Sequence, residues 1–305
     1  MKKAFLFFAT LIALASCNFM RQNADKPKAQ LITHKESADT MRIAGIDSSA
    51  IDSLTALIEY GLLSQERTKE VLQKVNFHDI LGSGSADAAT IFNGFYGTDR
   101  YRIEFYISDV VTDTANPFVI QLKGKSKYKK NITDFTGSIV LDSVFGFKDL
   151  TYDYQDFLTY YEGDTAEKFE GDTFIGTYHA KGHFKLDENS NQPGAGSFAG
   201  NFFMDFFPNY NENHELTGYN LWYNTHNETL RGGFLFDGSW ISYKTAETKP
   251  LLFAADLFMF GNEILEDFSY GEREIEINEK YRNLGWDNYW EAEEWWNTEA
   301  DTKAL

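Results

Sequence analysis

The middle of the chain alternates between apolar and polar residues with a period of two, the pattern of β-strands that bury one face. Runs of this kind follow one another from about Ile91 to about Tyr243. In the clearest run, residues 174–186, the polar face carries His179 and His183. The apolar faces of other runs are Tyr101, Ile103, Phe105 and Ile107; Phe118, Ile120 and Leu122; Phe198, Gly200, Phe202, Met204 and Phe206; and Phe234, Phe236, Gly238 and Trp240. The period predicts several long, half-buried strands.

Short turn sequences separate these runs, and connections this short join antiparallel neighbours. The turn signals are Asn116-Pro117 and residues 188–194, 208–211 and 231–233. An aromatic-x-Gly sequence also recurs, beginning at Phe92, Phe135, Phe174 and Phe198. Glycine inside a strand permits sharp bending, which a strongly curved sheet requires. We therefore expect a mainly β fold, with an antiparallel meander barrel or roll over residues 83–270.

Helical spacing precedes the strands, over residues 46–82. Ile51, Leu54, Leu57 and Ile58 form one apolar stripe, and Gly61 is suited to end that helix. Ser64 is suited to cap a second helix that carries Val71, Leu72 and Val75. The pattern predicts a helical hairpin. Such a hairpin either packs on the sheet or plugs a barrel end, or it binds a partner.

The C-terminal third has two features. Residues 251–268 are apolar and mixed, which favours a buried chain that crosses the core. Residues 271–305 form an acidic segment rich in tryptophan, and we expect a helical tail there. Exposed aromatic rings beside carboxylates stack on sugar rings, so this tail is a candidate glycan site; the alternative is that the rings dock onto the sheet. The candidate stacking residues are Trp286, Tyr289, Trp290, Trp295 and Trp296.

The chain begins with two lysines and a short apolar run that ends Leu14-Ala15-Ser16-Cys17. The run is too short to span a bilayer and has the proportions of a secretory signal. Its end resembles the lipobox of bacterial lipoproteins. That resemblance implies a signal peptide over residues 1–16 and acylation of Cys17, so that membrane lipid is the first partner. Residues 17–45 then comprise the lipidated cysteine and a polar, flexible tether.

Further resemblances concern location and fold. Asn18 follows the cysteine without an inner-membrane retention signal, so we expect a lipid-anchored protein of the cell envelope, at the outer membrane. The aromatic-rich, acidic composition and the C-terminal sequence near residues 271–286 resemble those of uncharacterised β-rich lipoproteins of Bacteroidetes-type bacteria. The curved aromatic sheet is also loosely similar to calycins, although no lipocalin Gly-x-Trp motif is found. A calycin-like barrel implies a small apolar ligand.

Charge and cysteine content narrow the function classes. The formal net charge is −18, and an acidic surface repels phosphate backbones, so we expect no nucleic-acid binding. Cys17 is the only cysteine, which leaves the mature chain no disulfide and no cysteine-ligated metal. We expect no cofactor.

Other candidate chemistry is weak. His179 and His183 would lie roughly 13 Å apart on a strand, too far to share a zinc ion, so we interpret them as surface histidines. Lys123, Lys125 and Lys127 lie on one strand face, which favours either an anion site or a charged sheet edge. A glycoside hydrolase would need two facing carboxylates, for which the strands offer Asp205, Asp237 and Asp256. No motif predicts an enzyme.

We therefore hold two main hypotheses. The first is a membrane-anchored exported lipoprotein that acts as a non-catalytic binding module for a small apolar ligand or a glycan. The alternative is a structural or accessory subunit of an envelope protein complex. An internal cavity would favour the first hypothesis, and a packed barrel with a large exposed apolar patch would favour the second.

Overall fold

The computed structural model describes residues 61–84, 89–113, 115–147, 177–210, 215–223, 227–270, 275–291 and 294–297. All of these belong to one compact unit, residues 46–305. The predicted signal peptide, Cys17, the tether and the first helix of the predicted hairpin lie outside the described residues.

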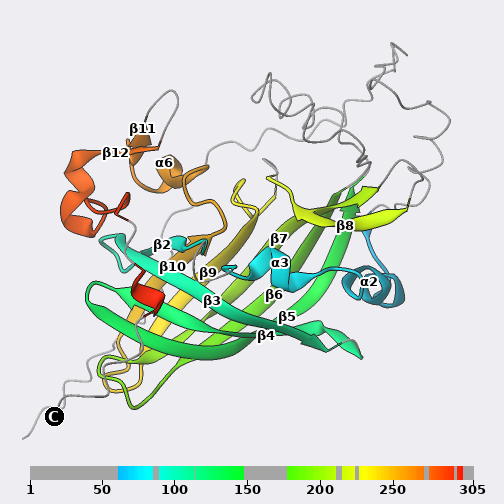
Figure 1. Ribbon diagram of the computed structural model, residues 1–305, viewed down its shortest axis with the longest axis horizontal. Coiled ribbons are helices and arrows are strands. Elements are labelled where there is room, and N and C mark those ends of the chain that lie inside the picture. The colour runs from blue at the N-terminus through cyan, green and yellow to red at the C-terminus, as the bar shows by residue number, and fades with distance from the viewer. Residues whose placement is uncertain are drawn as a thin grey trace, which may run out of the picture. The chain divides into compact units, whose positions relative to one another are not determined.

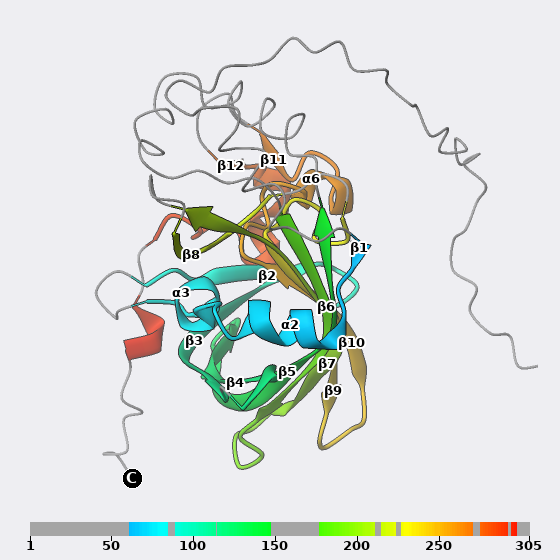
Figure 2. The ribbon, with the colours of Figure 1, turned by 90° about the vertical axis from the view of Figure 1, so that its right-hand side faces the viewer.

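Eight antiparallel strands of the described chain form a closed barrel (Figures 1 and 2). They are β2 (Phe92–Tyr96), β3 (Tyr101–Asp113), β4 (Asn116–Tyr128), β5 (Asn131–Phe147), β6 (Thr177–Glu188), β7 (Gly196–Tyr210), β9 (Phe234–Ser242) and β10 (Thr248–Ala254). Each pairs with the next in this order, and β10 pairs with β2 to close the ring. The short β1 (Gly61–Leu62) extends the pairing of β5, and β8 (Leu216–Leu221) that of β7. The predicted meander barrel is confirmed.

The apolar faces predicted for the strands point into this barrel. The alternating residues Tyr178, Ala180, Phe184 and Leu186 of β6 are all buried in one continuous core, as are the corresponding residues of β7 and β9. Burying a large apolar side chain contributes about 1.5–3 kcal/mol. The barrel interior is therefore the main source of stability in the fold.

Two helices lie across one opening of the barrel (Figure 2). Ser64 caps α2 (Gln65–Leu72), as predicted, by accepting a hydrogen bond from the Arg67 N–H at 3.2 Å. In α3 (Phe77–Leu81) the apolar residues are buried in the same core as the barrel interior. Of the interpretations of the hairpin, the described helices fit the one in which they plug a barrel end.

The expectation that residues 251–268 cross the core is wrong. Residues 251–254 belong to β10, the strand that closes the barrel. The chain then leaves the barrel, and Leu257, Phe260 and Phe268 pack in a second core against the outer faces of β2, β9 and β10. This second core receives side chains from α6 (Gly261–Ile264), β12 (Glu276–Ile277) and the 3-10 helix η2 (Glu279–Leu284), and β11 (Ser269–Tyr270) pairs with β12.

Within residues 275–291 and 294–297, the helical turns of the C-terminal tail are 3-10 turns. Gly285 follows η2 with a φ of 83°, a left-handed conformation that ends the helix. Trp286 is then buried in the second core, and η3 (Trp295–Asn297) forms one further turn. Docking onto the barrel thus sets the conformation of this segment.

Gly200 and Gly238 face each other across β7 and β9, and a Cβ at Gly200 would lie 2.4 Å from the Gly238 Cα. Gly200→Ala should therefore force the two strands apart and lower the free energy of unfolding by about 1–3 kcal/mol in urea titrations. Gly218→Ala in β8 is the matched control, because a Cβ there meets nothing within 4 Å. We expect it to change stability by less than about 0.5 kcal/mol. Equal effects of both substitutions would contradict this account of barrel packing.

Candidate functional site

The barrel interior is filled by the protein's own aromatic rings. Phe253 stacks between Phe105 and Phe236, with ring centroids 4.0 and 4.2 Å away. Phe184 and Phe202 meet Phe236 edge-on, each with centroids 4.9 Å apart. All five rings are at most 2% exposed. An apolar ligand inside this part of the barrel would have to displace these rings, so this region is a packed core.

A buried carboxylate lies at the barrel end where hairpins join β6 to β7 and β9 to β10. Glu188 accepts hydrogen bonds from the Ser126 hydroxyl at 2.8 Å, the Gly196 N–H at 2.8 Å and the Trp240 Nε1–H at 2.9 Å. Burial raises the pKa of the Glu188 carboxyl, although the three donors act in the opposite direction. Glu188 therefore ties β4, β7 and β9 together at this end of the barrel.

A second buried polar cluster lies on the outer surface. His179 of β6 and Asp205 of β7 are directly opposite each other, and each is only 1% exposed. His179 Nδ1 lies 2.7 Å from Asp205 Oδ1, which also accepts a hydrogen bond from Asn227 Nδ2 at 2.7 Å. The Thr229 hydroxyl donates to the other carboxylate oxygen. Asp205 is thus held by three side chains from two parts of the chain.

The loop between β8 and β9 covers this pair, because it supplies Asn227, Glu228 and Thr229. His179 Nε2 lies 3.0 Å from Glu228 Oε2, although the two atoms are not aligned for a hydrogen bond. Lys181 forms an ion pair with Glu228. Partial burial acts to raise the pKa of the Glu228 carboxyl, but the hydrogen bond from Lys181 and the neighbouring positive charge outweigh it, so the pKa lies below its ordinary value.

This cluster has one property of a catalytic centre and lacks others. A carboxylate that fixes one imidazole nitrogen leaves the other to exchange a proton. However, no hydroxyl or thiol of the described residues hydrogen-bonds to His179 Nε2. The described chain also contains no group of three His, Cys, Asp or Glu side chains placed to hold a metal ion. The cluster is therefore a polar clamp that ties the 227–233 loop to β6 and β7.

The interpretation of His179 and His183 as surface histidines is right for one of them. His183 is 58% exposed beside Asp142. His179 is buried because the 227–233 loop folds over the outer face of β6. Alternation along the strand could not reveal this cover, since the loop is distant in sequence.

The predicted stacking residues have different environments. Trp286 and Trp295 are 2% and 5% exposed, so neither offers a free face to a sugar. Tyr289 packs edge-on against Phe258, with centroids 4.8 Å apart, and Trp296 stacks on Tyr106. Trp290 is 66% exposed. The docking interpretation thus describes most of these rings, and a glycan-stacking role remains a prediction that rests mainly on Trp290.

Arg102 of β3 anchors the C-terminal segment to the barrel. It is 7% exposed and donates hydrogen bonds to Asn93 at 2.8 Å, Asn288 at 3.2 Å and Glu104 at 3.1 Å. Its guanidinium lies over the Trp286 and Tyr289 rings, 5.5 and 5.3 Å from their centroids. Such contacts offset the free energy that the Arg102 guanidinium loses when it is removed from water.

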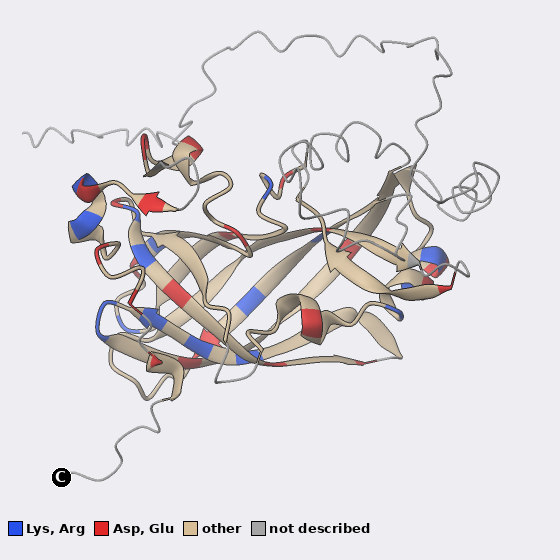
Figure 3. Cartoon of the chain, turned by 45° about the horizontal axis from the view of Figure 1, so that its top comes forward, with Lys and Arg blue, Asp and Glu red and all other residues tan. Residues whose placement is uncertain are grey.

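The three lysines of β4 each contact a carboxylate or a main-chain carbonyl of the same chain. Lys123 pairs with Asp109 at 3.3 Å, and Lys127 lies 3.6 Å from Glu104. Lys125 donates a hydrogen bond to the main-chain carbonyl of Trp296 at 2.8 Å. Basic and acidic positions are interspersed over the barrel strands (Figure 3). An anion site at these lysines would have to compete with all of these contacts.

The candidate carboxylates lie in three different environments. Asp205 belongs to the histidine clamp, Asp237 lies on the exposed face of β9, and Asp256 follows β10. Burial raises the pKa of Asp256, which accepts a hydrogen bond from the Phe258 N–H at 3.0 Å. No arrangement of these residues defines a hydrolase site.

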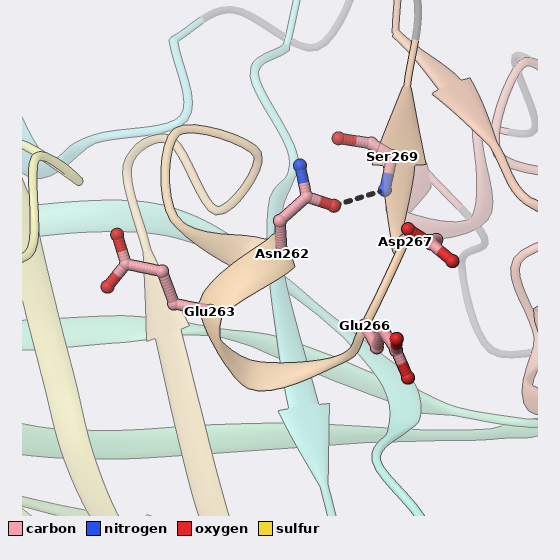
Figure 4. Close-up of a pocket in the computed structure, with 5 residues that line it drawn as sticks. All are labelled: Asn262, Glu263, Glu266, Asp267 and Ser269. Atoms are coloured by element: carbon pink, nitrogen blue, oxygen red, sulfur yellow. Dashed lines mark hydrogen bonds between the residues drawn. The ribbon is translucent and has the colours of Figure 1, made fainter.

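An open acidic depression lies beside α6 (Figure 4). Asn262 accepts a hydrogen bond from the Ser269 N–H at 2.9 Å across it. Two of its carboxylates already have cationic partners, since Glu263 pairs with Arg231 and Asp267 with Lys280. The remaining lining residue is Glu266. These ion pairs favour a solvated surface over a cation site.

Comparisons with known proteins found no relative, so the functional argument rests on the fold and on these clusters. No family model matches the sequence, and neither does any curated protein or solved structure. In the part of the chain that the structure describes, no helix has the length and apolar character needed to cross a membrane.

His179→Ala should lower the free energy of unfolding by about 1–3 kcal/mol, because it removes one of the three hydrogen-bonding partners of the buried Asp205 carboxylate. The measurement is chemical denaturation at neutral pH. His183→Ala is a matched control on the same strand face, where the imidazole is exposed, and it should change stability by less than about 0.5 kcal/mol. A small effect at His179 would show that the clamp does not hold the loop.

Glu188→Gln should flatten the pH dependence of stability. Because burial raises the folded-state pKa of Glu188 above its ordinary value of 4.5, the folded protein retains this proton to higher pH than the unfolded chain does. The corresponding stability is fully present below pH 4.5 and is lost as pH rises through the folded-state pKa. Urea unfolding of the wild type should show this decrease, and unfolding of Glu188→Gln should not.

The control for this pH series is Glu247→Gln, because the Glu247 side chain is 58% exposed in the neighbouring hairpin. It should retain the wild-type pH dependence. If both glutamine variants gave the wild-type profile, Glu188 would not be the group responsible.

Proposed function

We propose that the protein is a lipid-anchored, exported protein of the cell envelope that acts as a non-catalytic binding module. We further propose that it binds its partner on its outer surface, as an accessory subunit of an envelope protein complex. The observation that carries this choice is the filled barrel interior, where Phe253 stacks between Phe105 and Phe236. A carrier of small apolar ligands needs a cavity in their place.

The anchor is argued from the first seventeen residues. A short basic start, an apolar run and Leu14-Ala15-Ser16-Cys17 favour export and acylation at Cys17. Each buried CH₂ of an acyl chain contributes about 0.8 kcal/mol, so several chains would hold the protein on a membrane stably. Outer-membrane placement is part of the proposal and rests on Asn18, which follows the cysteine without an inner-membrane retention signal.

Glycan binding is the second candidate function, and Trp290 favours it. Its ring is 66% exposed and meets Tyr289 edge-on, with centroids 4.8 Å apart. Exposed tryptophan is suited to stack on a sugar ring. A single exposed ring gives little selectivity, so we place this function after protein binding.

Cys17→Ser should release the protein from membranes. In cells that export lipoproteins, we expect the wild type to incorporate labelled palmitate and to sediment with membranes. The serine variant should do neither, while its purified β domain unfolds at the wild-type temperature. A serine variant that remained labelled and sedimented would contradict the anchor.

The proposal that the protein binds its partner on the outer surface is tested by crosslinking and by a ligand screen. Crosslinking on intact cells should give a discrete adduct with the anchored wild type. A purified domain screened against fatty acids, bile acids and haem should show no rise in melting temperature. A ligand at 100 times its Kd would add about 2.7 kcal/mol, so a reproducible shift with one of these compounds would overturn the surface-binding proposal in favour of a carrier.

A further inference from the structure

The outer face of β3 and β4 carries a small site made of Glu104, Tyr106, Lys125 and Lys127. Glu104 is directly opposite Lys127 in the sheet, and Tyr106 is opposite Lys125. The site therefore presents two cations, one carboxylate and one aromatic ring side by side. We refer to these four residues as the β3–β4 site.

Residues 294–297, which include η3, occupy this site. The Trp296 ring stacks on Tyr106, with centroids 5.7 Å apart and planes at 17°. The Trp295 Nε1–H donates to Glu104 Oε1 at 3.3 Å, and Lys127 Nζ lies 5.8 Å from the centroid of the Trp295 ring. Lys125 donates to the Trp296 carbonyl at 2.8 Å. Every residue of the β3–β4 site thus contacts one of two consecutive tryptophans.

The segment is bound mainly by side chains of the barrel. It contains a single three-residue 3-10 turn, and its pairing with the barrel uses no β-ladder. Trp295 is nevertheless only 5% exposed. An element this short is marginal by itself, so the β3–β4 site supplies the free energy that orders it.

Charge adds a second basis for selectivity. The sequence around the two tryptophans is acidic, Glu291-Ala292-Glu293-Glu294 before them and Glu299 after them. Lys125 and Lys127 contact the two tryptophans themselves, and opposite charges across an interface favour correct encounter and register. The chemistry of the site therefore matches an acidic peptide with paired tryptophans.

We propose that the β3–β4 site is a peptide-binding site for acidic segments that carry paired tryptophans, and that residues 294–297 occupy it within the same chain. A partner segment of the same chemistry binds when it displaces these residues. The inference rests on the proposed function, because it names the surface through which the binding module acts and the class of partner that it takes.

The test uses the full-length chain with Trp295→Ala and Trp296→Ala, which empties the site without truncation. The probe is a fluorescent peptide with the sequence of residues 291–299, Glu-Ala-Glu-Glu-Trp-Trp-Asn-Thr-Glu. We expect it to bind the emptied variant more than about tenfold tighter than the wild type, because a tethered segment competes at an effective concentration in the millimolar range. A peptide with alanine at both tryptophan positions should not bind.

Charge reversal locates the binding. Lys125→Glu with Lys127→Glu, added to the emptied variant, should weaken peptide binding by more than about tenfold. Lys123→Glu is the matched control, because Lys123 lies on the same face of β4 and pairs with Asp109. It should leave binding within about twofold of the emptied variant. Circular dichroism and thermal unfolding check that each variant keeps the barrel.

The wild type provides a measurement that does not depend on the double tryptophan variant. A large excess of unlabelled peptide should increase backbone hydrogen exchange at residues 294–297, and the alanine peptide should not. Equal binding to the emptied and wild-type chains, or failure of both the binding and the displacement measurements, would overturn the inference. Acylation at Cys17 and crosslinking on cells would remain as measured, so this failure is distinct from failure of the proposed function.

Discussion

The pairing of β10 with β2 is the constraint on which the rest of the structure depends. β2 is only five residues long, and all five are buried. Gly94 lies opposite Phe253, and a Cβ at Gly94 would meet the Leu252 carbonyl oxygen at 2.5 Å. This close approach brings Phe253 into the centre of the aromatic stack. Without this pairing the sheet would have two open edges, and the aromatic rings would lose one wall.

The same pair of strands also supports the C-terminal part of the chain. Phe95 and Leu252 point outward from β2 and β10 into the second core, where Trp286 is buried. Arg102 on the neighbouring strand then links the barrel to Asn288. Both sides of the closing pair are therefore covered by apolar side chains. The C-terminal segment around Trp286 and Asn288 therefore contributes to holding the barrel closed.

Alternation predicted the strands that bury one face, and it failed where both faces are buried. In β10, Leu251 and Phe253 face the barrel while Leu252 and Ala254 face the second core, so no alternation is visible. His179 presents the opposite problem, because its outward position is predicted and its burial depends on a loop fifty residues away in the chain. Tryptophan content marked the C-terminal segment, but which rings are covered depends on Arg102 and the β3–β4 site.

The positions of the buried polar groups distinguish contacts that hold the fold together from contacts at the proposed peptide-binding surface. Burying a charge costs several kcal/mol unless its partners are well placed, so each buried charge marks a contact that the fold maintains. His179 and Asp205 fix the loop after β8, and Arg102 fixes the chain near Trp286. The contacts of Trp295 and Trp296 with β3 and β4 are of another kind, because half-buried Lys125 donates to a main-chain carbonyl and half-buried Lys127 lies over the Trp295 ring. Because Lys127 and Glu104 pair with each other as well as with Trp295, release of that end of the tail leaves neither charge without a partner.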